Sequence, residues 1–215
     1  MTRILPGVFA MAAIVVASNI LVQFLLLDGL LTWGAFSYPL AFLVTDIMNR
    51  VYGAASARRV ILAGFVVGIL CSLIGSQIML QGDGFEYAAV PFRVAIGSAT
   101  AFLVAQLLDV AVFNRLRDGS WWRAPLVSTL ISSTVDTVIF FSIAFSATLG
   151  GYFSDAVNGE INWAWGDVPF LNSFGDAPLW VSLAVADWGV KLAIALLALV
   201  PFRIMVGRML QKSAE

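Results

Sequence analysis

Histidine is absent from the 215 residues of the sequence, and cysteine occurs once, as Cys71 in an apolar run. The missing histidine removes the commonest metal ligand and the side chain most often used as a general base near neutral pH. A single cysteine forms neither a disulfide nor a thiolate cluster within one chain. We therefore expect no resident metal ion, no cofactor and no enzymatic centre.

Charged residues are also scarce, at 12% of the chain, and the formal net charge is −1. Soluble domains carry about 25% charged residues. A nucleic-acid-binding surface needs an excess of lysine and arginine. The composition therefore excludes nucleic acid as a partner.

Apolar residues dominate what is present. They account for 60% of the chain, and the mean hydropathy is +0.93. A soluble fold of this length could not bury so much apolar surface, and a disordered chain would be far less hydrophobic. We therefore expect the protein to be surrounded by a lipid bilayer.

Six stretches are long and apolar enough to cross the hydrocarbon core as helices, which takes roughly 20 residues. They are residues 4–27, 30–48, 60–80, 92–113, 124–149 and 179–202. The sequence therefore predicts an all-α membrane protein, in which residues 1–215 form a single integral-membrane domain built as a bundle of six transmembrane helices.

The stretch 30–48 is the weakest of the six. It is short, contains Pro39 and ends in the polar pair Thr45-Asp46. Proline interrupts a helix because it has no backbone N–H. Non-helical backbone is tolerated at membrane depth where protein or a wet cavity surrounds it. A full crossing and a broken or re-entrant element both fit this stretch.

Basic residues outside the spans fall on one side of this topology. Ten of the twelve lysines and arginines share that side: Arg3, Arg50, Arg58, Arg59, Arg115, Arg117, Arg123, Arg203, Arg208 and Lys212. The connections on the other side contain acidic residues and no basic one. Because cytoplasmic loops are enriched in lysine and arginine, the pattern predicts that both termini are cytoplasmic.

The longest connection, about residues 150–178, is external in this topology. It is rich in glycine and aromatic residues and has no periodic helix pattern. Long loops are usually functional or disordered, and aromatic side chains also gather at headgroup depth. A lid over an entrance and an interfacial segment fit this loop equally well.

Six charged residues remain inside the predicted spans: Asp46, Arg93, Asp109, Asp136, Asp187 and Lys191. A charge at the centre of a bilayer costs about 2.5–3.5 kcal/mol on insertion scales. We therefore expect these side chains to face the bundle interior or a wet cavity, paired or protonated. Asp187 and Lys191 are at positions i and i+4, so they can form a salt bridge within one helix. A pair that only neutralises its own charges and has no role in function is an equal alternative for these two residues.

Amide and hydroxyl side chains share helix faces with these charges. Asn19 and Gln23 are four residues apart, Gln106 and Asp109 are three apart, and Thr137 follows Asp136. Serine and threonine in the middle of a span usually hydrogen-bond between helices. A carboxylate among them indicates a functional site instead.

This set of side chains suits a flat, polar ligand. Carboxylates accept hydrogen bonds, amides donate and accept, and arginine offers a fork of donors. A heteroaromatic ring with amino, ring N–H and carbonyl groups would be matched along its edge, with Phe92, Phe140, Phe141 or Trp188 covering its faces. An inorganic cation would use the carboxylates but neither the amides nor the aromatic rings.

Small residues recur in the stretch 60–80, at Gly64, Gly68 and Gly75. Residues of this size at such spacing let two helices approach closely. Packing within one chain is the favoured interpretation, and a homodimer face is the alternative.

One set of motifs resembles a known family. Its centre is Tyr38-Pro39, Phe42-Leu43-Val44-Thr45-Asp46-Ile47, Val51-Tyr52-Gly53 and Ala57-Arg58-Arg59. Further matching segments are Ala17-Ser18-Asn19 with Gln23, Ala105-Gln106-Leu107-Leu108-Asp109 with Phe113-Asn114, Trp121-Trp122-Arg123-Ala124-Pro125, Asp136-Thr137, and Asp187 with Lys191. These segments extend over nearly the whole chain and resemble the signature of queuosine precursor transporters, also called vitamin-uptake transporters.

The resemblance implies a six-span importer in the bacterial inner membrane. Its substrates would be 7-cyano-7-deazaguanine and 7-aminomethyl-7-deazaguanine, precursors of the tRNA nucleoside queuosine. The predicted substrate-binding residues are Asn19, Gln23, Asp46, Arg93, Gln106, Asp109, Asp136, Thr137, Asp187 and Lys191. Asp136 and Asp109 would accept hydrogen bonds from the guanine-like donors. Asp46 and the Asp187–Lys191 pair are candidates for a gate or a proton relay.

Two other classes compete with a self-sufficient, proton-coupled importer. A substrate-binding subunit of an energy-coupling-factor-type vitamin or nucleobase importer would have a similar shape, and the chain has no phosphate-binding glycine loop with which to hydrolyse ATP itself. An intramembrane aspartyl protease would use two aspartates as a dyad, but the Tyr-Asp and Gly-x-Gly-Asp sequences of such proteases are absent. The energy source and the preferred precursor stay open.

Overall fold

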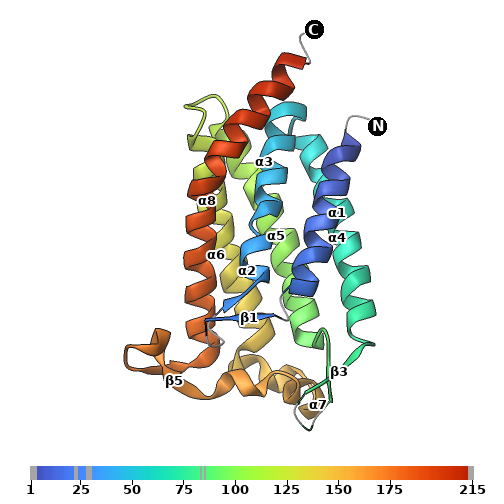
Figure 1. Ribbon diagram of the computed structural model, residues 1–215, viewed down its shortest axis with the longest axis vertical. Coiled ribbons are helices and arrows are strands. Elements are labelled where there is room, and N and C mark those ends of the chain that lie inside the picture. The colour runs from blue at the N-terminus through green and yellow to red at the C-terminus, as the bar shows by residue number, and fades with distance from the viewer. Residues whose placement is uncertain (1–3, 22–23, 28–30, 83, 85, 213–215) are drawn as a thin grey trace.

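The helices of the computed structural model run side by side along its long axis, and their connections gather at the two ends (Figure 1). The structure describes residues 4–21, 24–27, 31–82, 84 and 86–212. Within these ranges the α-helices are α1 (Leu5–Leu21), α2 (Gly34–Ser37), α3 (Leu40–Tyr52), α4 (Ala54–Gly75), α5 (Phe92–Leu116), α6 (Arg123–Phe145), α7 (Asp155–Gly159) and α8 (Leu179–Lys212).

Strands in the described residues form three short antiparallel hairpins and no extended sheet. They pair β1 (Leu25–Leu26) with β2 (Leu31–Thr32), β3 (Met79–Gln81) with β4 (Glu86–Ala88), and β5 (Asp167–Pro169) with β6 (Asp176–Pro178). Each hairpin lies in a connection between helices, so the helices alone make up the core.

Four helices, α4, α5, α6 and α8, are long and apolar enough to cross a membrane. They lie on the predicted stretches 60–80, 92–113, 124–149 and 179–202, which confirms a largely helical membrane protein and these four spans. The helix α8 has 34 residues and continues past Pro201, beyond the predicted end. The helix α1, with 17 residues, is shorter than the predicted first stretch.

The second predicted stretch is a broken helix. Helix α2 ends at Ser37 and α3 begins at Leu40, with Tyr38 and Pro39 between them. The backbone N–H of Ala41 bonds to the Tyr38 carbonyl at 2.9 Å, and that of Phe42 bonds to the Pro39 carbonyl at 3.1 Å. Both bonds span three residues instead of four, so the backbone is locally 3₁₀ here. Pro39 itself has no N–H, which removes one further bond of the α-helical ladder. Of the two alternatives for this stretch, the structure has the broken element.

The upper end of the bundle in Figure 1 is the basic end. There α1 begins, α3 turns into α4, α5 turns into α6, and α8 ends. The turn from α3 to α4 is made by Gly53 at φ +84°, a conformation that favours glycine. The guanidinium groups of Arg50 and Arg117 each donate to the other's backbone carbonyl and tie α3 to the end of α5. The further arginines near these helix ends are Arg58, Arg59, Arg115, Arg123, Arg203 and Arg208.

The lower end carries the long connection between α6 and α8. This segment contains α7, the β5–β6 hairpin and 3₁₀ turns at Ala147–Tyr152, Asn162–Trp165 and Phe170–Asn172. Ile161 and Ala164 are fully buried against Phe141 and Phe145, and the indole N–H of Trp165 donates to the Phe145 carbonyl at 2.7 Å. Exposed aromatic side chains of the same segment are Tyr152, Trp163 and Phe174. The segment therefore caps the lower ends of α5 and α6 and also presents aromatic side chains outward.

Glycines on α4 allow α1 to pack closely against it. A Cβ atom on Gly64 would lie 2.4 Å from Met11 Cγ, and one on Gly68 would lie 3.2 Å from Val15 Cγ1. Met11 is fully buried at this contact. The small residues of the third predicted span thus mediate packing within the chain, as the favoured interpretation stated.

We predict that Gly64→Ala lowers the thermal unfolding midpoint in detergent, because the new methyl group overlaps Met11 and overpacking costs about 1–3 kcal/mol. The matched control is Gly189→Ala in α8, where a Cβ meets nothing within 4 Å. That variant should be neutral or slightly stabilised, since alanine is the better helix former. Equal midpoints for the two variants would contradict the close α1–α4 contact.

Candidate functional site

The ionisable residues predicted inside the spans form two buried clusters, apart from Arg93. The lysine cluster comprises Tyr38, Asp136, Thr137, Asp187 and Lys191. The carboxyl cluster comprises Asp46, Asp109, Ser128, Thr129 and Ser132. Four helices supply the two clusters: α3, or the break before it, together with α5, α6 and α8.

Lys191 is the centre of the lysine cluster. Its ammonium nitrogen lies 2.7 Å from Asp136 Oδ2 and 2.5 Å from Asp187 Oδ2, and it donates to Thr137 Oγ1 at 3.1 Å. Thr137 in turn donates to Asp187 Oδ2 at 3.2 Å. The side chains of Lys191 and Asp136 are 4% and 3% exposed. The i, i+4 pair expected on α8 therefore forms, and Asp136 from α6 joins it as a second carboxylate.

Tyr38 connects this cluster to the break before α3. Its hydroxyl donates to Asp136 Oδ1 at 3.1 Å, and the Lys191 nitrogen lies 5.5 Å from the centre of its ring. The ring meets Phe42 and Phe102 edge-on, with ring centroids 6.3 Å apart in both pairs. Tyr38 was not among the predicted site residues. The signal that could have found it is its place in the Tyr38-Pro39 motif.

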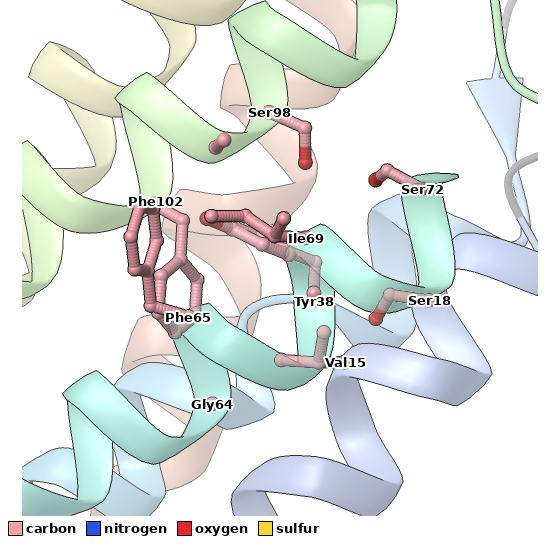
Figure 2. A pocket seen from close by; sticks show the side chains of 11 residues that line it. Val15, Ser18, Tyr38, Gly64, Phe65, Ile69, Ser72, Ser98 and Phe102 are labelled. Carbon is pink, nitrogen blue, oxygen red and sulfur yellow. The ribbon is translucent and has the colours of Figure 1, made fainter. Parts of the chain in front are cut away.

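A small cavity adjoins Tyr38. It lies between α1, α4 and α5 and has a volume of about 30 Å³. Figure 2 shows hydroxyl groups of Ser18, Ser72 and Ser98 around it, with the rings of Phe65 and Phe102 on the other side. This is room for water, not for a bicyclic ring. Tyr38 therefore lines this cavity and also bonds to the buried acceptor Asp136.

The carboxyl cluster lies closer to the basic end. Ser128 and Thr129 of α6 are each 3.4 Å from an oxygen of Asp46, and Ser132 is 3.0 Å from Asp109 Oδ1. The two acids therefore face adjacent turns of α6. The hydroxyl residues of the fifth predicted span thus do bond between helices, as expected, and their partners here are two acids.

Amide side chains link α3 and α5 beside this cluster. Thr45 Oγ1 donates to Gln106 Oε1 at 2.5 Å, and Asn49 Nδ2 donates to the Val110 carbonyl at 3.3 Å. Three buried side-chain atoms have no hydrogen-bond partner among the described residues: Asn49 Oδ1, Gln106 Nε2 and Asp109 Oδ2. Buried polar atoms without partners are rare in folded proteins. They therefore identify this region as one that can receive a ligand or a proton.

Arg93 belongs to neither cluster. It is fully buried at the lower end of α5 and donates to the Ile143 carbonyl at 3.0 Å, to Asn158 Oδ1 at 3.0 Å and to the Ser146 carbonyl at 2.7 Å. These bonds hold the start of the long connection against α5 and α6. The donor role predicted for Arg93 at the outer mouth stays a prediction.

Other predicted residues lie away from the clusters or outside the description. Phe140 and Phe141 pack with Phe145 under the long connection, whereas Phe92 and Trp188 are exposed on the bundle surface. Asn19 belongs to α1, but its side chain lies outside the described part of the structure, and Gln23 lies outside it altogether. The ring beside Lys191 is that of Tyr38, which packs against Phe42 and Phe102.

We predict that Lys191→Met destabilises the protein by about 3–5 kcal/mol, because it leaves two buried carboxylates without their cation. Thermal unfolding in detergent measures the change. The control Arg203→Met removes a cation that stacks on Trp121 at the basic end and should cost no more than about 1 kcal/mol. A Lys191→Met midpoint equal to that of the wild type would contradict the role of Lys191 in holding the cluster.

Comparison with known proteins identifies the family. Residues 32–206 match the family model described as "Putative vitamin uptake transporter". The chain is 31% identical over 212 residues to the queuosine precursor transporter of Escherichia coli K12, which covers 94% of this chain and 86% of that protein. It is 35% identical over 172 residues to the probable queuosine precursor transporter of Haemophilus influenzae, with coverages of 77% and 70%.

A third relative, the probable queuosine precursor transporter of Bacillus subtilis, is 28% identical over 182 residues, with coverages of 78% and 68%. No solved structure gives a significant match. The matched range contains both buried clusters, helices α4, α5 and α6, and α8 up to residue 206. The chain therefore belongs to the vitamin uptake transporter family, whose members are transporters and not enzymes, and its apolar helices fit a multi-pass protein of the bacterial inner membrane.

Proposed function

We propose that this protein imports a 7-deazaguanine precursor of queuosine, 7-cyano-7-deazaguanine or 7-aminomethyl-7-deazaguanine, across the bacterial inner membrane. The names of its relatives support this substrate class. The observation that carries the proposal is the bond between Tyr38 and Asp136, a buried carboxylate acceptor separated by one ring from a hydroxyl-lined cavity. A guanine-like edge presents the N–H and NH₂ donors that such an acceptor requires.

The protein would cross the membrane six times with both termini cytoplasmic. Two features support this topology. The helices α1 and α8 begin and end at the same end of the bundle, and the arginines collect at that end, as the positive-inside rule requires of a cytoplasmic face. The short α1 and the broken α2–α3 element would be the first two crossings, kept inside the bundle where protein satisfies the freed backbone groups.

The substrate would bind Asp136 in place of the Tyr38 hydroxyl. Tyr38 donates one hydrogen bond to Asp136 in this structure, and a substrate amino group could donate in its stead. Thr137 and Lys191 would face the remaining edge, and Phe102 would cover a ring face. Because the cavity is smaller than the substrate, binding requires α1 or α4 to move outward from Tyr38.

The remaining predicted residues take supporting roles in this proposal. Gln106 would present its unpartnered Nε2 to the substrate carbonyl, and Asn19 and Gln23 of the first predicted span would complete the edge. Arg93 would hold the external connection in place while the substrate is bound. Proton coupling is part of the proposal, since the carboxyl groups can change their protonation during a cycle.

We predict that cells unable to make the precursors regain queuosine in their tRNA when they express this protein and receive 7-cyano-7-deazaguanine. Queuosine is measured by mass spectrometry of tRNA nucleosides. Purified protein in liposomes should also take up the substrate without another component. Binding without uptake by the purified protein would favour the ATP-driven binding-subunit alternative, and absence of both would contradict the proposed function.

We predict that Asp136→Asn weakens binding of 7-cyano-7-deazaguanine by roughly 10- to 100-fold, the value of a hydrogen bond to a charged group. Isothermal titration of the purified protein measures the affinity. A second ligand, 7-cyano-7-deazaguanine without its 2-amino group, tests the contact. The wild type should bind this analogue more weakly than it binds 7-cyano-7-deazaguanine. The Asp136→Asn variant should bind the two compounds with equal affinity, or the analogue more tightly.

The control for this experiment is Asp155→Asn, an exposed acid in α7 at the lower end. It should bind both compounds like the wild type. If the wild type does not distinguish the two compounds, the amino group does not reach Asp136 and the assignment of this acceptor is wrong.

A further inference from the structure

Two buried acids face each other in the carboxyl cluster with no cation bonded to them. Asp46 is 3% exposed and Asp109 is fully buried. Within the described ranges, the salt bridges that form both involve Lys191, which is bonded to Asp136 and Asp187 in the other cluster. The nearest arginines along the chain are Arg50 and Arg115. Arg50 donates to the Arg117 carbonyl, and Arg115 is exposed. Neither acid therefore has a positive partner in the described part of the chain.

The hydrogens available from neighbouring hydroxyls do not satisfy the two acids. Each hydroxyl has one hydrogen to donate. Ser128 lies near both Asp46 Oδ1 and the Pro125 carbonyl, and Ser132 lies near both Asp109 Oδ1 and the Ser128 carbonyl. Asp109 Oδ2 has no partner at all among the described residues. The cluster therefore has fewer hydrogens than acceptors.

One additional proton resolves this shortage. Asp46 bonds to Ser128 and Asp109 bonds to Ser132, one turn further along α6, so the two carboxyl groups lie close together, and a hydrogen bond between them exists only when one of them carries a proton. Two carboxylates this close in a buried site cannot both be ionised, as in the aspartic-protease dyad. We propose that Asp46 and Asp109 share one proton, and that this pair is the proton-binding site of the importer; the second half rests on the transport function proposed above.

The other helices around the pair carry their ionisable groups at other positions. Helix α1 has none, and α6 meets the pair with hydroxyl groups, while its Arg123 lies at the helix start and its Asp136 belongs to the lysine cluster. On α8, Lys191 is bonded to Asp136 and Asp187, and Arg203 stacks on Trp121. On α4, Arg58 and Arg59 are exposed near its start. The protonation of the pair is thus governed by the two acids themselves and by their access to water.

A second small cavity adjoins Asp46. It lies between α3, α6 and α8 and is lined by Asp46, Thr129, Leu199 and Phe202, among others, with a volume of about 10 Å³. That is about the space needed for one water. A water there would lie beside Asp46 and could exchange a proton with the pair.

The pair is also adjacent to the proposed substrate contact. Thr45 precedes Asp46 on α3, Gln106 lies one turn before Asp109 on α5, and Thr45 donates to Gln106 at 2.5 Å. A substrate that hydrogen-bonds to Gln106 would shift α3 relative to α5. Because the shared proton needs the two acids in contact, this shift changes the affinity of the pair for the proton.

The first experiment detects the proton without any substrate. Infrared spectra of the purified full-length protein in lipid distinguish the C=O stretch of a protonated carboxyl group from the bands of a carboxylate. We expect a buried protonated carboxyl band at neutral pH, lost in both Asp46→Asn and Asp109→Asn and kept in the control Asp187→Asn, whose acid is bonded to Lys191. Asparagine preserves the fold because its amide supplies the missing hydrogen. A wild-type spectrum without this band overturns the proposal and requires no variant.

The second experiment measures coupling in proteoliposomes with the membrane potential clamped at zero. An inward gradient of one pH unit should raise the accumulation ratio of 7-cyano-7-deazaguanine by about tenfold for one proton per substrate. Asp109→Asn should lose this effect of the pH gradient, and Asp155→Asn should keep it. Gradient-driven accumulation by Asp109→Asn, or a sodium gradient replacing the proton gradient in the wild type, overturns the assignment.

The two experiments separate this inference from the function on which it rests. If the wild type neither binds nor moves the substrate but retains the infrared band, the transport function fails and the shared proton stands. If it transports the substrate without the band, the function stands and the shared proton fails.

Discussion

The ammonium group of Lys191, held between Asp136 and Asp187, is the interaction on which the interior of this bundle depends. A bilayer offers no water to solvate a charge, so each of these three side chains is tolerable only beside the others. Asp187 and Lys191 are on α8 and Asp136 is on α6, and the Tyr38 hydroxyl adds a contact from the break before α3. One cation therefore fixes the relative position of three separate segments.

The second cluster has the opposite composition, with two acids, three hydroxyls and no cation bonded to them in the described residues. Its neutrality has to come from a proton, and a proton can leave. In the proposed transport cycle the two clusters would have different roles. The lysine cluster would be a permanent acceptor for a flat, donor-rich ligand, and the carboxyl cluster would change its charge when the helices move.

Hydropathy predicted α4, α5, α6 and α8 because a helix satisfies its own backbone groups in lipid, which leaves little freedom for these segments. Because of Pro39, a broken helix was one of two alternatives for the second predicted stretch, residues 30–48. In the structure the helix is interrupted at this proline. The sequence also located each buried charge. Which charged residues from different helices pair with each other could not be predicted. The approach of Asp136 to Lys191 and of Asp46 to Asp109 depends on the order of the helices in the bundle and on the rotation of each helix about its axis.

Tyr38 illustrates what a one-dimensional pattern leaves out. A tyrosine before a proline resembles a turn residue, and only the direction imposed by the break brings its hydroxyl to Asp136. Arg93 is a similar case: its place at the outer end of the predicted span suggested a ligand donor, and its bonds in the structure go to Asn158, to the Ser146 carbonyl and to the Ile143 carbonyl near the end of α6. These tertiary contacts are not visible in the sequence.

The central claim is that a guanine-like ligand takes the place of the Tyr38 hydroxyl on Asp136. An experimental structure of the wild-type protein with bound 7-cyano-7-deazaguanine tests it most directly. The account predicts ligand nitrogen atoms at hydrogen-bond distance from the Asp136 carboxylate, with the Tyr38 hydroxyl displaced. A ligand bound elsewhere, with the Tyr38–Asp136 bond intact, would contradict it.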